Sequence, residues 1–128
     1  MAKRESIEKQ SWKPGNVLSP APPVLVSCGG TQGWKPNLIT IAWAGNVCSD
    51  PPMLSISVRP ERYSFEIIRT MREFVVNVPS LKQARAVDWC GMVSGRSEDK
   101  FAGAGLTPAS ALKVRPPIVL ECPLNIEC

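Results

Sequence analysis

Short runs of apolar and β-branched residues, separated by prolines and glycines, recur along this chain. The alternation is clearest in the run 53–58, where Leu54, Ile56 and Val58 fall on one face and two serines fall on the other. Such runs predict β-strands at 24–28, 38–44, 53–58, 73–78, 118–122 and 124–128. Because proline interrupts strand ladders and helix interiors, the prolines between these runs favour a barrel or sandwich of short strands.

Two short helices and a helical turn are predicted between the strands. The first helix begins at Ser64, a residue type that caps helix N-termini, and its apolar residues at helical spacing are Phe65, Ile68 and Met71. The second begins at Ser80, where SLKQ matches a capping box, and the residues it is expected to bury are Leu81, Ala84 and Val87. The turn begins at Ser97, with Glu98 and Asp99 in its first turn. The order of elements predicts a mainly antiparallel β architecture with inserted helices.

The composition is that of one folded domain. The chain has 128 residues, of which 44% are apolar and 20% are charged, enough for a single hydrophobic core. No run approaches the roughly 18 apolar residues of a membrane-spanning helix, and the polar start MAKRESIEKQSW lacks the apolar stretch of a secretory signal. We therefore expect a cytoplasmic protein with no membrane partner.

The absence of histidine narrows the possible chemistry. It excludes histidine-dependent triads and histidine metal clusters within this chain. The five cysteines contain no CxxC pair, so no structural zinc or iron–sulfur site is expected, and most of them are interpreted as small buried core residues. No carboxylate pair can be assigned to acid–base work, so an enzyme with this sequence would depend on a cofactor.

The net charge of +4 is mild, and about half of it lies in the first 13 residues. This charge permits an anionic ligand but is weak evidence for nucleic acid. A small β-barrel that binds single strands is an alternative, suggested by the four tryptophans. The aromatic residues are not interleaved with a basic stripe, however, so no nucleic acid partner is expected.

Three segments are candidates for a binding site. In the run 37–43, Thr40 lies among apolar neighbours, so this is either a core strand or a strand whose backbone groups meet a flat heterocycle. Trp43 is either a packing residue, the preferred interpretation, or a wall of the site. In the run 57–64, Arg59 and Arg62 precede the expected helix start at Ser64. Helix N–H groups beside guanidinium groups suit phosphate oxygens, so this run is either an anion site or a solvated loop.

The third segment, 90–101, has Gly91 and Gly95 on either side of Ser94, followed by positive charge at Arg96 and Lys100. The glycines permit close approach of the backbone to a ligand. The alternative is a plain turn between helices, because the run matches neither a Walker loop nor a dinucleotide GxGxxG motif.

Four blocks, in this order, resemble the flavin reductase-like, FMN-binding split-barrel family: TIAWAGNVCSDPPMLSISVRPERYS, EFVVNVPS, CGMVSGRSEDKFAGAGLTP and ECPLNIEC. Within the family they are most similar to the small flavin reductase and flavoredoxin type. The resemblance covers residues 18–128, which follow a polar N-terminal arm at 1–17. It implies a six-stranded antiparallel Greek-key split β-barrel with short inserted helices.

The resemblance also implies non-covalently bound FMN, near the interface of a homodimer. The residues implied to line the isoalloxazine and ribityl region, largely through backbone groups, are Asn37, Leu38, Ile39 and Thr40. Those implied to hold the phosphate are Ser57, Arg59, Arg62, Tyr63 and Ser64. Those implied to close the pocket are Ser94, Gly95, Lys100 and Phe101. No catalytic side chain and no metal are implied.

Family members extend further than this chain, so the late barrel strands are expected to be absent, leaving an edge that another chain could cover. The leading hypothesis is an NAD(P)H:flavin reductase-like oxidoreductase. It would pass hydride or electrons through FMN to a free flavin, a ferric complex or a redox protein. The alternative is a flavoredoxin-like electron carrier that holds FMN without an NAD(P)H site of its own.

Overall fold

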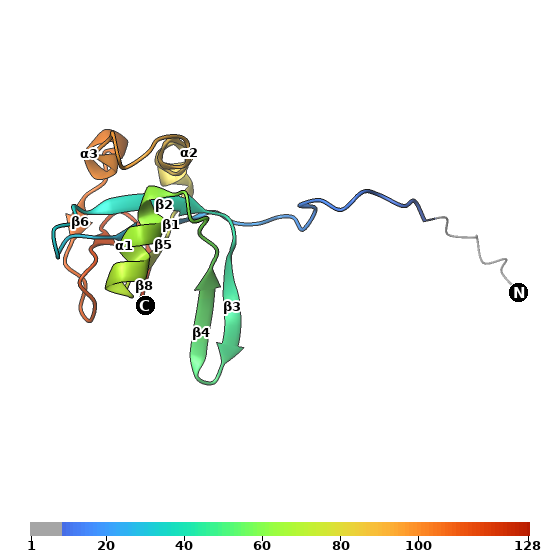
Figure 1. The fold of residues 1–128 in the computed structure, drawn as a ribbon, viewed down its shortest axis with the longest axis horizontal. Coiled ribbons are helices and arrows are strands. Elements are labelled where there is room, and N and C mark those ends of the chain that lie inside the picture. The colour runs from blue at the N-terminus through green and yellow to red at the C-terminus, as the bar shows by residue number, and fades with distance from the viewer. Residues whose placement is uncertain (1–8) are drawn as a thin grey trace, which may run out of the picture.

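The computed structural model describes residues 9–128. Residues 9–23 run as an exposed chain without helix or strand and extend away from the body of the domain (Figure 1). The polar arm expected at 1–17 lies partly outside the described residues, since it includes 1–8. Within the described part, no helix has the length and apolar character needed to cross a bilayer.

Antiparallel strands form three sheets. The largest has four strands, in the spatial order β2 (Asn37–Ile41), β1 (Val24–Cys28), β5 (Val75–Val78) and β8 (Leu124–Glu127). The two-stranded sheets pair β3 (Ala44–Ser49) with β4 (Pro52–Ile56), and β6 (Pro108–Ala109) with β7 (Ile118–Val119). The predicted mainly antiparallel β architecture with inserted helices is therefore confirmed, with eight strands rather than six between residues 9 and 128.

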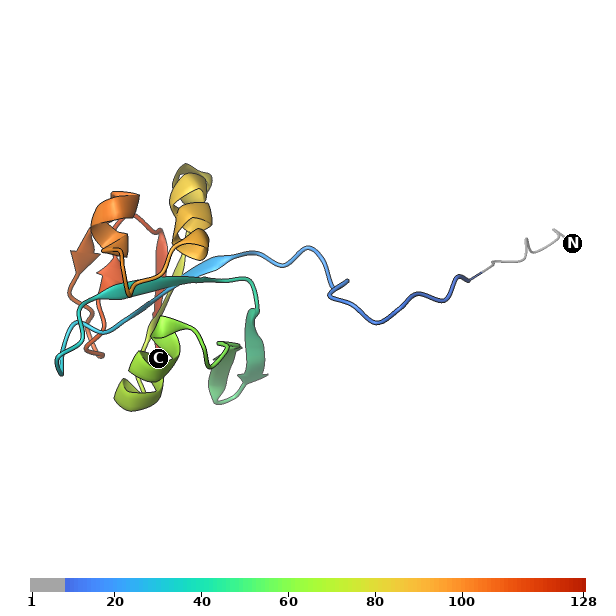
Figure 2. The ribbon, with the colours of Figure 1, turned by 45° about the horizontal axis from the view of Figure 1, so that its top comes forward.

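The helices cover both faces of the large sheet. They are α1 (Tyr63–Met71), the short 3₁₀ helix η1 (Leu81–Gln83), α2 (Ala84–Met92) and α3 (Lys100–Ala104). Figure 2 shows α2 and α3 on one side of the sheet and α1 on the other. All five residues of β1 are buried: Leu25 packs in a cluster with residues of α2 and α3, whereas Cys28 packs with Ile67 and Met71 of α1. This double covering buries β1, which lies between β2 and β5 in the sheet, whereas β2 forms one edge of the sheet.

The prediction of a single strand at 38–44 is wrong. The chain bends at Ala42, directly after β2, and a new strand begins at Ala44. That new strand, β3, pairs with β4 as a hairpin, and the backbone N–H of Ser57 donates to the carbonyl of Trp43 at 2.9 Å. A continuous apolar run carries no sign of such a bend, because both halves of the run have strand-forming composition.

The start of the first helix also differs from the prediction. Arg62 occupies the N-cap position without a side-chain hydrogen bond, and Ser64 lies inside the first turn. The buried residues of α1 are Ser64, Ile67 and Met71, so the buried face is rotated from the predicted stripe of Phe65, Ile68 and Met71. The buried Ser64 belongs to a polar network described below, which pattern analysis does not anticipate.

The second helix and the turn after it are partly as predicted. The capping box of Ser80 and Gln83 is confirmed, and Val87 is buried. Leu81 is 90% exposed and Ala84 is also exposed, because the box opens the short η1 and not a continuous α-helix. The helix expected from Ser97 begins three residues later, at Lys100, where the Asp99 side chain accepts from the N–H of Ala102 at 3.1 Å.

The cysteines are free thiols. Cys28, Cys90 and Cys122 are buried, which confirms the core interpretation for most of them, while Cys48 and Cys128 are half-buried.

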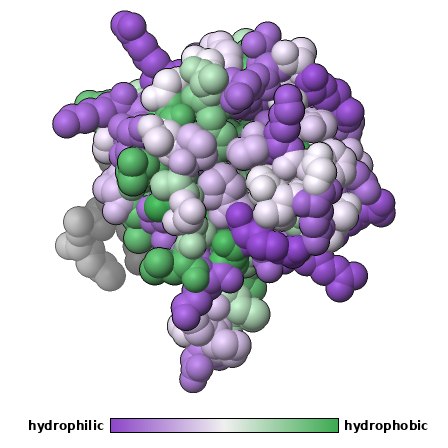
Figure 3. Space-filling model, turned by 90° about the vertical axis from the view of Figure 1, so that its left-hand side faces the viewer, coloured by the Kyte–Doolittle hydropathy of each residue, from purple (hydrophilic) through white to green (hydrophobic). Residues whose placement is uncertain are grey.

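On the face turned away from the N-terminal segment, hydrophilic side chains cover most of the surface (Figure 3).

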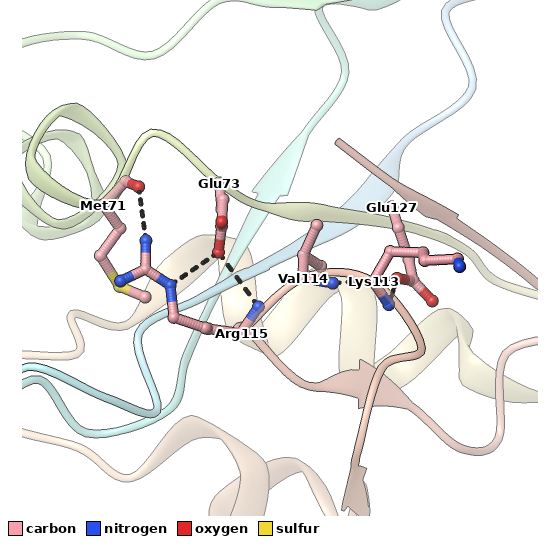
Figure 4. Close-up of polar contacts among 6 residues, drawn as sticks. All are labelled: Met71, Glu73, Lys113, Val114, Arg115 and Glu127. Carbon is pink, nitrogen blue, oxygen red and sulfur yellow. Dashed lines mark hydrogen bonds and ion pairs between the residues drawn. The ribbon is translucent and has the colours of Figure 1, made fainter.

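Carboxylates hold the long segment between β6 and β7. Glu127 of β8 accepts hydrogen bonds from the backbone N–H groups of Leu112, Lys113 and Val114. Figure 4 shows Glu127 with Lys113 and Val114. Glu73 accepts from both the backbone N–H and the Nε of Arg115, at 3.1 and 2.9 Å. These contacts tie an otherwise irregular loop to the edge of the large sheet.

Candidate functional site

A cavity of about 350 Å³ opens where β2, the start of α1, the end of α2 and the loop before α3 meet. Its volume lies within the range of small-molecule sites, roughly 300–1,000 Å³. The elements around it come from distant parts of the sequence, and the hydrogen bond from Thr40 Oγ1 to the carbonyl of Val87, at 2.6 Å, joins two of them.

Most of the predicted site residues line this cavity. They are Asn37, Ile39, Thr40, Ser57, Arg59, Arg62, Tyr63, Ser64, Ser94, Gly95 and Lys100. The side chains of Leu38 and Phe101 do not: they are buried in the cluster between the sheet, α2 and α3. The three candidate segments therefore converge on one site, and the segment 90–101 is both a connection between helices and a cavity wall.

The positive charge deepest in the cavity belongs to Lys100, the first residue of α3. Lys100 is only 5% exposed, and its Nζ donates to the carbonyl of Cys90 at 2.7 Å. Burial has the largest effect and lowers its pKa; the Cys90 and Cys28 thiols act in the opposite direction, and Arg62 adds a smaller lowering. Within residues 9–128, the ion pairs do not include Lys100, so this ammonium faces the cavity without a carboxylate partner. A buried cation of this kind favours an anionic ligand.

The N-terminus of α1 points its unpaired backbone donors to the same region. Arg62 offers no side-chain cap, and the first N–H groups of a helix have no partner within it. Tyr63 and Ser64, the first two residues of the helix, both line the cavity. These N–H groups and the helix dipole favour negative charge, so α1 and Lys100 are suited to the same anion.

Arg59 is placed differently from a simple anion ligand. Its side chain is 66% exposed and forms an ion pair with Glu61, which also lines the cavity. The pKa of Glu61 is lowered by a backbone hydrogen bond and by the adjacent Arg59. The charge of Arg59 is therefore partly balanced already, whereas that of Lys100 is not.

Aromatic packing holds the loop after α2 against α1. The guanidinium carbon of Arg96 lies 5.4 Å from the centre of the Tyr63 ring, and Trp34 contacts the same ring edge-on, with centroids 6.1 Å apart. Gly95 is tightly enclosed, because a Cβ at this position would overlap Asn37 Oδ1 and the ring of Tyr63. Glycine is thus required for this loop to close the cavity.

Part of the cavity wall differs from the preferred interpretation of the sequence. Trp43 is 55% exposed and lines the cavity, as in the alternative interpretation, because the bend at Ala42 turns the chain away from the sheet. Gly91 lines the cavity as its candidate role implied, whereas the missed residues at the end of α2 are Cys90, Met92 and Val93. They directly precede Ser94, so the available signal was their adjacency to a predicted site residue.

Comparison with known proteins agrees with this geometry. Residues 18–128 match the family model described as flavin reductase like domain. An uncharacterized protein of Archaeoglobus fulgidus is 34% identical over 94 residues, which cover 73% of this chain and 53% of that protein. A second uncharacterized protein, from Pyrococcus abyssi, is 34% identical over 88% of this chain and 63% of its own length. The chain thus spans between half and two thirds of these relatives.

Among solved structures, flavoredoxin of Desulfovibrio vulgaris (Miyazaki F) is similar, with a TM-score of 0.87 and 37% identity over 94% of this chain and 65% of that one. The fold described above is accordingly that of the split-barrel proteins in this group.

Proposed function

The chain belongs to the flavin reductase-like domain family, and on this premise we propose that it binds FMN non-covalently in the cavity and acts as a flavin-dependent oxidoreductase. The observation that carries the proposal is the buried Lys100 ammonium, which faces the cavity beside the N-terminus of α1 and has no acidic partner among residues 9–128. The phosphate group of FMN would provide the negative charge that pairs with the Lys100 ammonium. We take residues 18–128 as the flavin-binding domain.

The residues present fit this cofactor at both ends. Lys100, Arg62 and the first N–H groups of α1 would hold the phosphate, with Ser57, Ser94 and Arg59 nearby. Ile39 and Thr40 of β2, together with the half-exposed Trp43, offer backbone groups and apolar surface for a flat ring. When bound, FMN supplies hydride and electron transfer at its isoalloxazine ring. The chain's own residues bind and orient the group, and we assign none of them as a general acid or base.

We propose NAD(P)H as the electron donor, and a free flavin, a ferric complex or a redox protein as the acceptor. The alternative, an electron carrier without its own NAD(P)H site, is favoured by the similarity to flavoredoxin. Anaerobic oxidation of NADH and NADPH by the FMN-loaded protein separates the two. The reductase hypothesis expects nicotinamide oxidation that depends on FMN, whereas the carrier hypothesis expects none.

Two further proposals concern the oligomeric state and the cellular location of the protein. We propose a homodimer with the cavity near its interface. We also propose a cytoplasmic location, supported by five cysteines that are all free thiols.

Removal of the arginines at the mouth of the cavity tests the anion site. We expect Arg62→Ala to weaken FMN binding by about 1–3 kcal/mol, because a charge-assisted hydrogen bond is lost, and Arg59→Ala to weaken it less, because Glu61 already balances part of the Arg59 charge. Flavin fluorescence titration measures the affinity. Arg69→Ala is the matched control, since Arg69 is an exposed residue of α1 that pairs with Glu66 away from the cavity lining. Unchanged affinity in both cavity variants would place the phosphate elsewhere.

A further inference from the structure

The closed end of the cavity is built around the Asn37 side chain. Asn37 opens β2 and is 3% exposed, and its Nδ2 donates to Ser64 Oγ in α1 at 2.8 Å. Its Oδ1 lies against Gly95, in the loop after α2. One buried amide group therefore contacts two separate segments that line the cavity.

A third segment completes this junction. Cys28 is the cross-strand partner of Asn37 in the β1–β2 ladder. Burial raises the pKa of the Cys28 thiol to about 11, and the nearby Ser64 and Asn37 side chains act in the opposite direction. Ser64 is 2% exposed and Cys28 is fully buried, so the thiol packs beside the Asn37–Ser64 hydrogen bond in a region shielded from water. Buried hydrogen bonds of this kind hold their partners in one geometry.

We propose that Asn37 is a positioning residue for the phosphate end of the cofactor, which acts through Ser64 and Gly95. This inference rests on the proposed FMN site and differs from a role of Asn37 at the flavin ring. The amide nitrogen is hydrogen-bonded to Ser64, and the amide oxygen packs against Gly95, so the side chain is held between α1 and the loop after α2. Its contribution is to fix the first turn of α1 relative to the loop that carries Ser94.

The matching test compares FMN with riboflavin, which has the same ring but no phosphate. In Asn37→Ala we expect FMN affinity to fall about tenfold, because Ser64 loses its buried donor. Riboflavin affinity is expected to change by less than about twofold, so the ratio of the two affinities falls. Asn125→Ala is the control: Asn125 also donates a side-chain bond, to Asn77 at 2.8 Å, but it does not line the cavity. It should leave the ratio unchanged.

A second variant keeps the test decisive if Asn37→Ala folds poorly. Asn37→Asp preserves the shape but places a carboxylate against Ser64 and near the phosphate position. We expect its preference for FMN over riboflavin to be lost at neutral pH and to recover on acidification, when the carboxyl group can donate again. Wild-type protein measured at each pH provides the reference. A purely structural role would change the melting temperature without changing the ratio.

The outcomes separate this inference from the function on which it rests. If the wild-type protein binds neither flavin, the proposed function fails, and this inference fails with it. If the wild-type protein binds FMN but the Asn37 variants lose FMN and riboflavin equally, Asn37 contacts the ring and only this inference is overturned. An unchanged ratio in both variants overturns it as well.

Discussion

At the scale of single residues, Lys100 makes FMN affinity sensitive to pH. Its buried ammonium has a lowered pKa, so it loses its charge at a lower pH than an exposed lysine does. Only the charged form attracts phosphate strongly, and we therefore expect FMN binding to weaken as pH rises from 7 toward the ordinary lysine pKa of 10.5. In Lys100→Met, affinity at pH 7 should fall about 10–100-fold, and the dependence on pH over this range should disappear.

Fluorescence titrations at several pH values measure both effects. Lys82→Met serves as the control, because Lys82 is an exposed lysine of η1 that does not line the cavity. A Lys100→Met variant that keeps the wild-type dependence on pH would show that another group titrates.

At the scale of elements, the carboxylates on the sheet edge stabilise the loop that follows β6. The hydrogen bonds from the backbone of Leu112, Lys113 and Val114 lower the pKa of Glu127. A carboxyl group whose pKa is lower in the folded state stabilises that state fully above its ordinary pKa of 4.5, and this stabilisation is lost as pH falls through the lowered value. Protonation is thus expected to release the loop (Figure 4).

The corresponding variant is Glu127→Gln. Because Glu127 lies at the surface and is only half-buried, we expect the melting temperature of this variant at pH 7 to fall by no more than about a few degrees, with a smaller loss of stability on acidification than in the wild type. Thermal unfolding followed by circular dichroism between pH 3 and 7 measures this. Glu66→Gln removes a carboxylate that pairs only with Arg69, and it should leave the melting temperature nearly unchanged. Equal effects in the two variants would contradict the loop-holding role of Glu127.

The same elements show what the sequence can and cannot predict. Alternation and proline placement locate β1, β4 and β8, because these signals are local. The two-residue β6 has no such pattern: it is held by contacts from far along the chain, such as the N–H of Thr107 with the carboxylate of Glu121. In the site, charged and glycine residues could be predicted from their motifs. The buried position of Ser64 could not, since it follows from its pairing with Asn37 across 27 residues of sequence.

At the scale of the whole molecule, the β3–β4 hairpin is the feature that most favours contact with a second protein chain. It projects from the body of the domain in both ribbon views (Figures 1 and 2). Val47 is 60% exposed and Met53 is 49% exposed, and an apolar groove of about 950 Å³ extends from the hairpin to β5 and α2. An isolated hairpin is only marginally stable in water, and a broad apolar surface commonly marks an interface. A second copy of the chain would cover both.

Thr40, Gly91 and Met92 line both this groove and the candidate flavin cavity, so a partner seated on the groove would lie next to the flavin.

We expect the double variant Val47→Asp, Met53→Asp to raise the dissociation constant of the dimer by at least about tenfold, since each buried apolar side chain contributes roughly 1.5–3 kcal/mol. FMN affinity should fall in parallel, and increasing the protein concentration should restore it. Sedimentation equilibrium with and without FMN measures the first effect, and titration at two protein concentrations measures the second. Leu112→Asp is the control, because Leu112 is an 89% exposed apolar residue that lies outside the hairpin, in the loop between β6 and β7. A wild-type protein that stays monomeric at high concentration would leave the hairpin without this partner, and FMN affinity would then be independent of protein concentration.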